Sequence, residues 1–383
     1  MDSALPQESN SNLTENSVLT TNIPTSEQLP PDSVNLKANS PQQTPKKPSK
    51  FSLKKIIIVA VVLAVGILLF TYFHHTAKST VQTKVYKVGI LDSLQAKFGE
   101  TANGFEQGMT SLGYIQGKNI TYDVENKGLT GNQNTFQKFI RDKDNLVVVI
   151  PTEPTEEAEE YLKDSGIPII SLAASFEGTS LINSIQQPGH NLTGVRYPGP
   201  EDSAEALSVL HQLAPNDTRV LSPYLAGYPN VPGQLAALQA EAKTLGMTVT
   251  PEPLAPNKVS TFVAGLSPTN PGFDAIVGMA EPFDATPSLN GPLYDFANQH
   301  NIPIVGNYIS NNDTGPIAYV GPSSNEMGRL AAPLAVKIFN GTHAGTLPIL
   351  TPVSKLQINL KIAQRSGITP DAGLLSTASV VIR

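Results

Sequence analysis

The sequence predicts an α/β protein of two doubly wound lobes, preceded by one transmembrane helix and a disordered tail. Three observations predict this fold class. From residue 85 onward, short runs rich in β-branched residues alternate with helical patterns, as in parallel sheets covered by helices. That succession recurs at an offset of about 130 residues, which is too long for a solenoid repeat. One long apolar run precedes this body and follows a polar N-terminal segment.

Length and composition fit this organisation. The 383 residues exceed one ordinary domain and suggest two folded units with appendages. Charged residues make up only 15% of the chain, and the net charge of -6 argues against a nucleic-acid partner. Cysteine is absent, which excludes disulfides, thiolate metal sites, cysteine nucleophiles and a lipid-modified cysteine as a membrane tether.

The N-terminal region predicts a membrane anchor. Residues 1–50 are rich in Ser, Thr, Asn, Gln and Pro without apolar periodicity, which predicts a disordered tail. Within residues 51–75, nothing from Ile56 to Phe73 is charged, and this run is roughly 27 Å long as a helix, close to the thickness of a bilayer core. Lysines crowd its N-terminal flank. The tail is therefore expected in the cytoplasm and the body outside the cell, held by a single-pass anchor in the cell membrane.

A cleaved signal peptide is the competing interpretation of this run. Its positively charged region would then extend over about fifty residues, and no small-residue cleavage pattern follows Phe73 cleanly. An uncleaved anchor is therefore favoured.

The body divides into alternating strands and helices. Strands are expected at 85–91, 120–124, 146–150 and from 167, with helices at 99–112, 136–140 and 155–165. The near-continuous apolar run at 146–150 is typical of a strand buried on both faces of a parallel sheet. Later, a long helical pattern carries Pro333 near its middle.

An internal duplication defines the lobes. Leu-Gly before an extended run occurs at 112–113 and 245–246, and Ile-Pro-Ile occurs at 167–169 and 302–304. An Asp-led apolar strand lies between these markers in each half. The first lobe is expected to comprise residues 85–195 plus 316–346. The second is expected to comprise 196–315 plus 347–383, so that the chain crosses between lobes several times.

Motifs for catalysis and metal binding are missing. The chain has no GxSxG, HExxH or Walker lysine loop, and no GxGxxG follows the first strand. The six histidines are scattered without carboxylates at metal-ligand spacing. We therefore expect no enzyme activity, no catalytic residues, no metal and no cofactor.

The carboxyl ends of the expected strands carry the candidate binding residues, because ligands of open α/β sheets bind there. The candidates from these ends are Ser93, Leu94, Thr152, Ala174, Ser175, Tyr224, Glu281 and Asn307. Hydroxyls and free amides at a helix start suit a carboxylate, and a carboxylate such as Glu281 suits an ammonium group.

These residues also have structural interpretations. Thr152 and Thr155 are both placed to cap the acidic helix. Glu281 is equally a solvated loop carboxylate. For Tyr224, Tyr228 and Tyr308, each taken singly, ordinary packing in a loop is the favoured interpretation.

Five segments resemble one known family. They are GFEQGMTSLGYIQGKNITYDVEN, NLTGV, QLAALQAEAKTLGMTV, MGRLAAPLAVKIFNG and LPILTPVSKLQINLKIAQRSGI. These resemble the ABC transporter substrate-binding family that includes binders of tryptophan and other aromatic amino acids. The resemblance covers residues 85–368 and implies a type I periplasmic-binding fold that captures a small solute between its lobes.

Site residues also follow from this resemblance. The family's strand-end Thr matches Thr152, and its loop Asn at the start of a second-lobe helix matches Asn230. Three positions depart from the family pattern, namely Ser175-Phe176 in place of Asp-Pro, Glu281 in place of Asp, and Ser324 in place of an aromatic residue. The scaffold therefore carries over better than the ligand does.

The expected function is that of the membrane-anchored, extracytoplasmic solute-binding component of an ABC importer. Its partners would be a small solute, with an amino acid as one candidate, and the permease and ATPase subunits. The alternative is an anchored ligand-sensing receptor module without a transport role.

Overall fold

The computed structural model describes residues 63–67, 84–93, 95–306 and 314–383. The chain divides into two units, Met1–Thr80 and Val81–Arg383. In the first unit, residues 63–67 are helical and exposed. The expected tail at 1–50 and most of the expected anchor at 51–75 lie outside the described residues. Within the described part, no helix has both the length and the apolar character needed to cross a bilayer.

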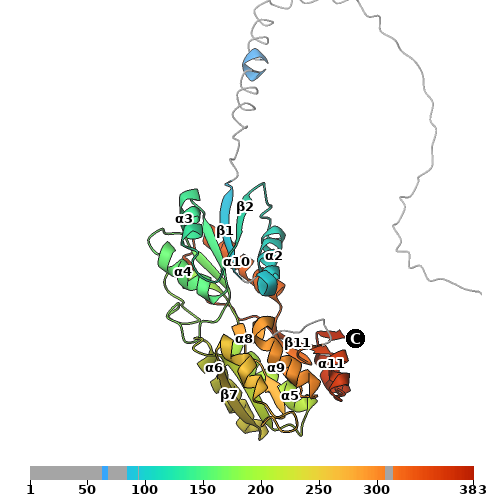
Figure 1. Cartoon of the computed structure of the whole chain (residues 1–383). Helices are drawn as coiled ribbons and strands as arrows, with labels where there is room; N and C mark the ends of the chain where they lie inside the picture. Colours follow the sequence, from blue (N-terminus) through green and yellow to red (C-terminus); the bar gives the residue numbers. More distant parts are fainter. Residues whose placement is uncertain (1–62, 68–83, 94, 307–313) are drawn as a thin grey trace, which may run out of the picture. The chain divides into compact units, whose positions relative to one another are not determined.

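The first lobe, which carries β1 and β2 in Figure 1, is built on a five-stranded parallel sheet. The strand order is β2-β1-β3-β4-β5. Its strands are β1 (Tyr86–Asp92), β2 (Ile120–Asn126), β3 (Leu146–Ile150), β4 (Ile169–Ala174) and β5 (Leu192–Arg196). All five residues of β3 are buried, as its continuous apolar run predicts.

The second lobe repeats this order and extends it. Its seven-stranded sheet runs β7-β6-β8-β9-β10-β11-β12, in which β11 is antiparallel to β10. The strands are β6 (Arg219–Leu225), β7 (Thr248–Leu254), β8 (Ala275–Val277), β9 (Ile304–Gly306), β10 (Ala318–Pro322), β11 (Ser354–Asn359) and β12 (Val380–Ile382). Strands β6–β10 thus match β1–β5 one for one, which confirms the predicted two-lobed, doubly wound architecture.

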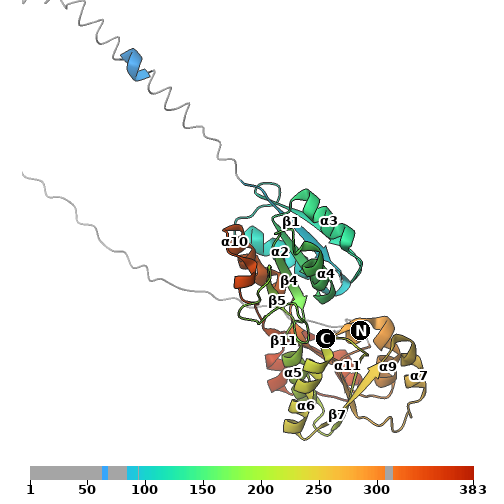
Figure 2. The ribbon, with the colours of Figure 1, turned by 90° about the vertical axis from the view of Figure 1, so that its left-hand side faces the viewer.

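Helices cover both faces of each sheet (Figure 2). On the first lobe, α2 (Gln95–Ser111) and α10 (Ser324–Phe339) pack on one face, while α3 (Gln133–Asp142) and α4 (Thr152–Leu162) pack on the other. The second lobe has α5 (Gly199–Leu213), α6 (Val231–Leu245), α11 (Leu360–Arg365) and α12 (Ala372–Thr377) on one face. Its other face carries α7 (Val259–Ala264), α8 (Pro282–Ala285) and α9 (Pro287–Gln299).

Strand alternation divides each core into two layers. Leu146, Val148 and Ile150 pack with α2 and α10, whereas Val147 and Val149 pack with α3 and α4. Successive side chains of a strand point to opposite faces, so one apolar run supplies both layers.

Glycines bring α2 and α10 into close contact. A Cβ on Gly104 would lie 2.1 Å from the Asn325 carbonyl oxygen, and one on Gly328 would lie 2.0 Å from that of Thr101. Gly108 likewise faces Ala332 across the interface. Helix α10 comes late in the chain but packs on the first lobe. Its contact with α2 therefore joins the two chain segments that build this lobe.

Three segments cross between the lobes, after β5, after β10 and before β11. The second crossing lies between Pro322 and Ser324 rather than at the expected residue 316, because β10 pairs with β9 and β11 in the second sheet. The third crossing also lies later than the expected residue 347. Leu347 and Ile349 pack in the first lobe, and Leu350 bridges to Val195 of β5. The boundaries between the lobes depend on which strands pair with each other, and the sequence of one strand does not predict its pairing partner.

Arg196 joins the crossings where β5 ends. Its guanidinium pairs with Glu177 at 2.6 Å and with Glu201 at the start of α5, and its Nε donates to Thr351 Oγ1 at 2.9 Å. Its backbone N–H donates to the Leu350 carbonyl oxygen at 2.9 Å. One side chain therefore links the first lobe, the first helix of the second lobe and the third crossing.

The contact between α2 and α10 predicts opposite effects of one substitution at two helical glycines. Gly328→Ala should lower the free energy of unfolding by about 1–3 kcal/mol, because the new methyl group meets backbone rather than a movable side chain. Gly233→Ala in α6, where a Cβ meets only ordinary contacts, should raise it by about 0.5–1 kcal/mol. Denaturant unfolding of both variants measures the difference. A Gly328→Ala variant as stable as Gly233→Ala would contradict the packing described.

Candidate functional site

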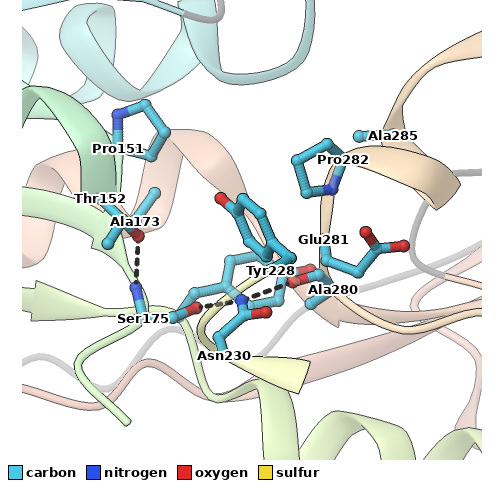
Figure 3. Close-up of a pocket in the computed structure, with 11 residues that line it drawn as sticks. Pro151, Thr152, Ala173, Ser175, Tyr228, Asn230, Ala280, Glu281, Pro282 and Ala285 are labelled. Carbon is cyan, nitrogen blue, oxygen red and sulfur yellow. Dashed lines mark hydrogen bonds between the residues drawn. The ribbon is translucent and has the colours of Figure 1, made fainter. Parts of the chain in front are cut away.

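A pocket with about 400 Å³ of empty space, part of it open to solvent, lies between the two lobes at the carboxyl ends of the parallel strands. We call it the inner pocket. It is lined by Pro151, Thr152, Ala173, Ser175, Tyr197, Tyr228, Asn230, Ala280, Glu281, Pro282 and Ala285 (Figure 3). An outer pocket of about 280 Å³ shares four of these residues, Thr152, Ser175, Tyr228 and Asn230, and adds Glu153, Glu156, Thr179 and Pro229. Both lobes therefore contribute to each pocket.

Thr152 is the first residue of α4 and holds the loop after β4. Its Oγ1 accepts a hydrogen bond from the backbone N–H of Ser175 at 3.0 Å (Figure 3). Thr155 is fully buried, where its hydroxyl donates to the Pro151 carbonyl oxygen at 2.6 Å and lies 2.7 Å from Ser171 Oγ. Neither threonine caps α4. The expected alternative of simple helix capping is therefore wrong for both residues.

Asn230 bridges the lobes from the start of α6. Its Nδ2 donates to Ser175 Oγ of the first lobe and to the Ala280 carbonyl oxygen of the second, each at 2.9 Å (Figure 3). A carbonyl oxygen can only accept, which fixes the orientation of the amide. Asn230 Oδ1 is consequently left buried without a partner in the described structure, on a side chain only 5% exposed. An unpaired buried acceptor is unfavourable unless a ligand supplies a donor.

Gln234 keeps this part of the site in place. Its Oε1 accepts from the Ala280 backbone N–H at 2.7 Å, and its Nε2 lies 3.2 Å from the Ala280 carbonyl oxygen. Gln234 is fully buried one helical turn after Asn230. The backbone after β8 is therefore held in position on the helix that carries Asn230.

Glu281 is a buried carboxylate at the start of α8. Its Oε2 accepts from the backbone N–H groups of Phe283 at 3.0 Å and Leu225 at 3.1 Å, while Oε1 has no partner in the described structure. The side chain is 4% exposed, so the alternative of a solvated loop carboxylate is wrong. Burial raises its pKa to about 7, although the two backbone donors oppose that shift.

Tyr228 makes a second contact between the lobes. Its hydroxyl donates to Glu153 Oε1 of α4 at 2.7 Å, and burial followed by the charge of Glu153 raises the pKa of this phenol. The neighbouring Pro229 approaches the first lobe at Gly178, where a Cβ would lie 2.7 Å from the Pro229 carbonyl oxygen. The segment from Tyr228 to Asn230 is thus the part of the second lobe that contacts the first across both pockets.

Four of the nine candidate residues line the inner pocket, namely Thr152, Ser175, Asn230 and Glu281. Ser93 and Ala174 are buried but line neither pocket, and Tyr224 is half-buried within β6. Leu94 and Asn307, like Tyr308, lie outside the described residues. Phe176, the second residue of the Ser175-Phe176 departure from the family pattern, packs in the core of the first lobe.

Ala173 takes the place expected for Ala174 because of a bulge. The register of β4 against β5 shifts between Leu172 and Ala174, and Ala173 adopts a left-handed conformation with φ of 57°. Sequence reasoning also missed Tyr197 and Ala285 and treated Tyr228 as loop packing. Tyr197 lies in a crossing segment, so its position depends on how the lobes meet and carries no local signal.

Comparisons with known proteins agree with this geometry. The family model for the ABC transporter substrate binding protein matches residues 88–382. A conserved domain protein from Vibrio cholerae is similar in structure, with a TM-score of 0.67 and 22% identity over 78% of this chain and 100% of its own. The ABC domain from Streptococcus pneumoniae in complex with L-Trp has a TM-score of 0.66 and 23% identity, with the same coverage.

A third similar structure is the ligand-free, open form of a substrate-binding protein with adhesive properties from Clostridium difficile. Its TM-score is 0.63, with 23% identity over 78% of this chain and 99% of its own. The search of curated protein sequences returned no significant match.

The raised pKa of Glu281 predicts a pH-dependent stability difference. Stability contributed by the buried, protonated carboxyl is fully present below its unfolded value of 4.5 and is lost as pH rises through about 7. Glu281→Gln removes that loss, so its stability relative to wild type should rise by about 1–3 kcal/mol between these pH values. Thermal melts of both proteins at a series of pH values measure the difference.

Glu160→Gln serves as the matched control, because Glu160 is exposed on α4. The difference in stability between Glu160→Gln and wild type should not change over the same pH range. Burial also raises the pKa of Asp144 and of Asp202, but both groups are common to all three proteins and cancel in the comparison. If the stability difference between Glu281→Gln and wild type stayed constant over this pH range, the buried environment described for Glu281 would be contradicted.

Proposed function

Because the chain belongs to the family of ABC transporter substrate-binding proteins, we propose that it captures a small solute between its lobes for an ABC importer. Its partners in that role are the permease and ATPase subunits. The family implies solute binding rather than catalysis, and the pocket provides polar groups for recognition rather than a nucleophile activated by a base.

The unpartnered oxygen of Asn230 is the observation that carries this proposal. It lies buried at the junction of the two lobes, on an amide whose nitrogen donates a hydrogen bond of 2.9 Å to each lobe. A solute that donates to this oxygen would be bound most strongly when the lobes are together. Binding would then favour the closed arrangement, which the permease can distinguish from the open one.

The closing equilibrium sets an energetic requirement. Shifting a 1:99 population to 99:1 takes about 5.5 kcal/mol of preference for the closed form. Direct contacts between the lobes, such as Tyr228 with Glu153, supply part of the free energy of closure, and the solute must supply the rest.

An amino acid is our first candidate solute. Thr152 and Ser175 would offer hydroxyls, Asn230 and Glu281 would accept hydrogen bonds, and Tyr197 and Tyr228 would contact an apolar part. The similar Streptococcus pneumoniae structure holds L-Trp, which supports this class. Ser93, Leu94, Ala174, Tyr224 and Asn307 remain proposed contacts for a lobe arrangement that differs from this one.

We also propose that residues 51–75 anchor the protein in the cell membrane, with residues 1–50 in the cytoplasm and the lobes outside. The uncharged run from Ile56 to Phe73 and the lysines before it support this arrangement. Without a cysteine for lipid attachment, the polypeptide itself must provide the tether.

Solute binding is tested by thermal shift and calorimetry on the full-length chain in detergent, with a panel of amino acids and other small solutes. A solute at 100 times its Kd should stabilise the protein by about 2.7 kcal/mol. Asn230→Ala should weaken binding at least about tenfold, because it removes a buried acceptor. Asn103→Ala, an exposed change on α2, should leave the affinity unchanged.

Uptake measurements separate the importer from the ligand-sensing receptor. Deleting the gene should abolish uptake of the solute that binds in vitro. Normal uptake, combined with a lost cellular response to the solute, would favour the receptor instead. If no solute of any class binds, the proposed function is wrong.

The anchor is tested by fractionation of cells. The full-length chain should sediment with membranes and resist extraction by alkaline carbonate, whereas a chain lacking residues 51–75 should be soluble. Recovery of a mature protein from the medium that begins near Thr76 would instead show a cleaved signal peptide.

A further inference from the structure

The described lining of the two pockets carries acidic side chains and no basic ones. Glu281 lines the inner pocket, and Glu153 and Glu156 line the outer pocket. Among the described residues that line either pocket there is no Lys, Arg or His. Among the described residues, none of these three carboxylates forms an ion pair.

Every buried side-chain atom of the described lining that lacks a partner is an oxygen able to accept a hydrogen bond. In the described structure these atoms are Glu153 Oε2, Asn230 Oδ1 and Glu281 Oε1, which come from both lobes. Asn230 and Glu281 are at least nine-tenths buried, and Figure 3 shows the Asn230 amide between Ser175 and Ala280 on the pocket wall. The lining is therefore complementary to a ligand that donates hydrogen bonds.

The outer pocket concentrates this negative charge. Glu153 and Glu156 lie in the first two turns of α4, and burial together with the charge of Glu153 raises the pKa of Glu156. The start of a helix ordinarily favours an anion, but two carboxylates at this helix start oppose that preference. Tyr228 also lines the outer pocket, and the face of its ring would favour a cation.

We propose that the solute carries a positive charge, an ammonium or guanidinium group, which lies in the outer pocket beside Glu153, Glu156 and Tyr228. This rests on the proposed function and narrows its substrate class. The rest of the solute occupies the inner pocket, where its hydrogen-bond donors reach Asn230 and Glu281. A solute whose only charged group is a carboxylate is rejected by repulsion from the same residues.

Two series of probes of matched shape test the proposal by calorimetry on the full-length chain in detergent. The first is 1,5-diaminopentane, 5-aminopentanoate and glutarate, which share one chain length and differ in net charge. The second is phenethylamine, phenylalanine and 3-phenylpropionate. In each series the affinity should fall from the amine to the acid by at least about tenfold, and added salt should weaken binding of the amine.

Variants of two glutamates on α4 test whether the positive group of the solute lies in the outer pocket. Glu156→Gln should weaken binding of the amine by about threefold to tenfold, since it removes one nearby charge that is partly screened by solvent. Glu160→Gln removes an equal charge one turn later, from an exposed residue outside both pockets, and should change the affinity less than about twofold. Both residues are exposed, so neither variant threatens folding.

The outcomes separate this proposal from the broader one. If the acids bind as well as the amines, or if Glu156→Gln and Glu160→Gln have equal effects, the cationic solute is excluded while solute capture stands. If neutral sugars or peptides bind and the amines do not, the same conclusion holds. If no probe of either series binds, the cationic solute is excluded, and the wider panel of solutes decides whether the protein captures a solute at all.

Discussion

The linkage at Arg196 is the interaction on which the arrangement of the two lobes depends. This side chain ends the last strand of the first sheet, pairs with Glu177 and Glu201, and donates to Thr351 of the third crossing. It is nearly buried, and it satisfies carboxylates from both lobes at once. A buried ion pair contributes little net stability, but it is strongly destabilising to break. Arg196 therefore contributes more to how the lobes are joined than to their stability.

The pockets follow from that junction. Matching sheet orders bring the carboxyl ends of both sheets to the same interface, so residues more than fifty positions apart, such as Ser175 and Asn230, become hydrogen-bonded neighbours. Ala280 is then held by Gln234 and Asn230 together. With the backbone fixed in this way, Asn230 Oδ1 and Glu281 Oε1 are held in position although neither accepts a hydrogen bond in the described structure.

Much of the fold could be predicted because the strands carry their own signals. The run from Leu146 to Ile150 is a strand from end to end, and Gly246 ends α6 in the left-handed conformation that glycine favours. The site was harder to predict. Thr152, Ser175 and Glu281 follow from their place at strand ends, and Asn230 follows from the family resemblance. Tyr197 and Tyr228 depend instead on how the lobes meet. Ala173 replaced Ala174 because one bulge reverses which side chain faces the pocket.

By itself, the sequence determined the alternation of strands and helices, the duplication and the family, since these depend on apolar periodicity and on short motifs. Only the tertiary structure decided where the chain crosses between lobes, because β10 joins the second sheet through hydrogen bonds to β9 and β11. The tertiary structure also decided whether the Glu281 carboxyl is buried or exposed to solvent. A carboxylate in a loop is solvated or buried according to what packs around it, and here the end of β6 and the start of α8 enclose it.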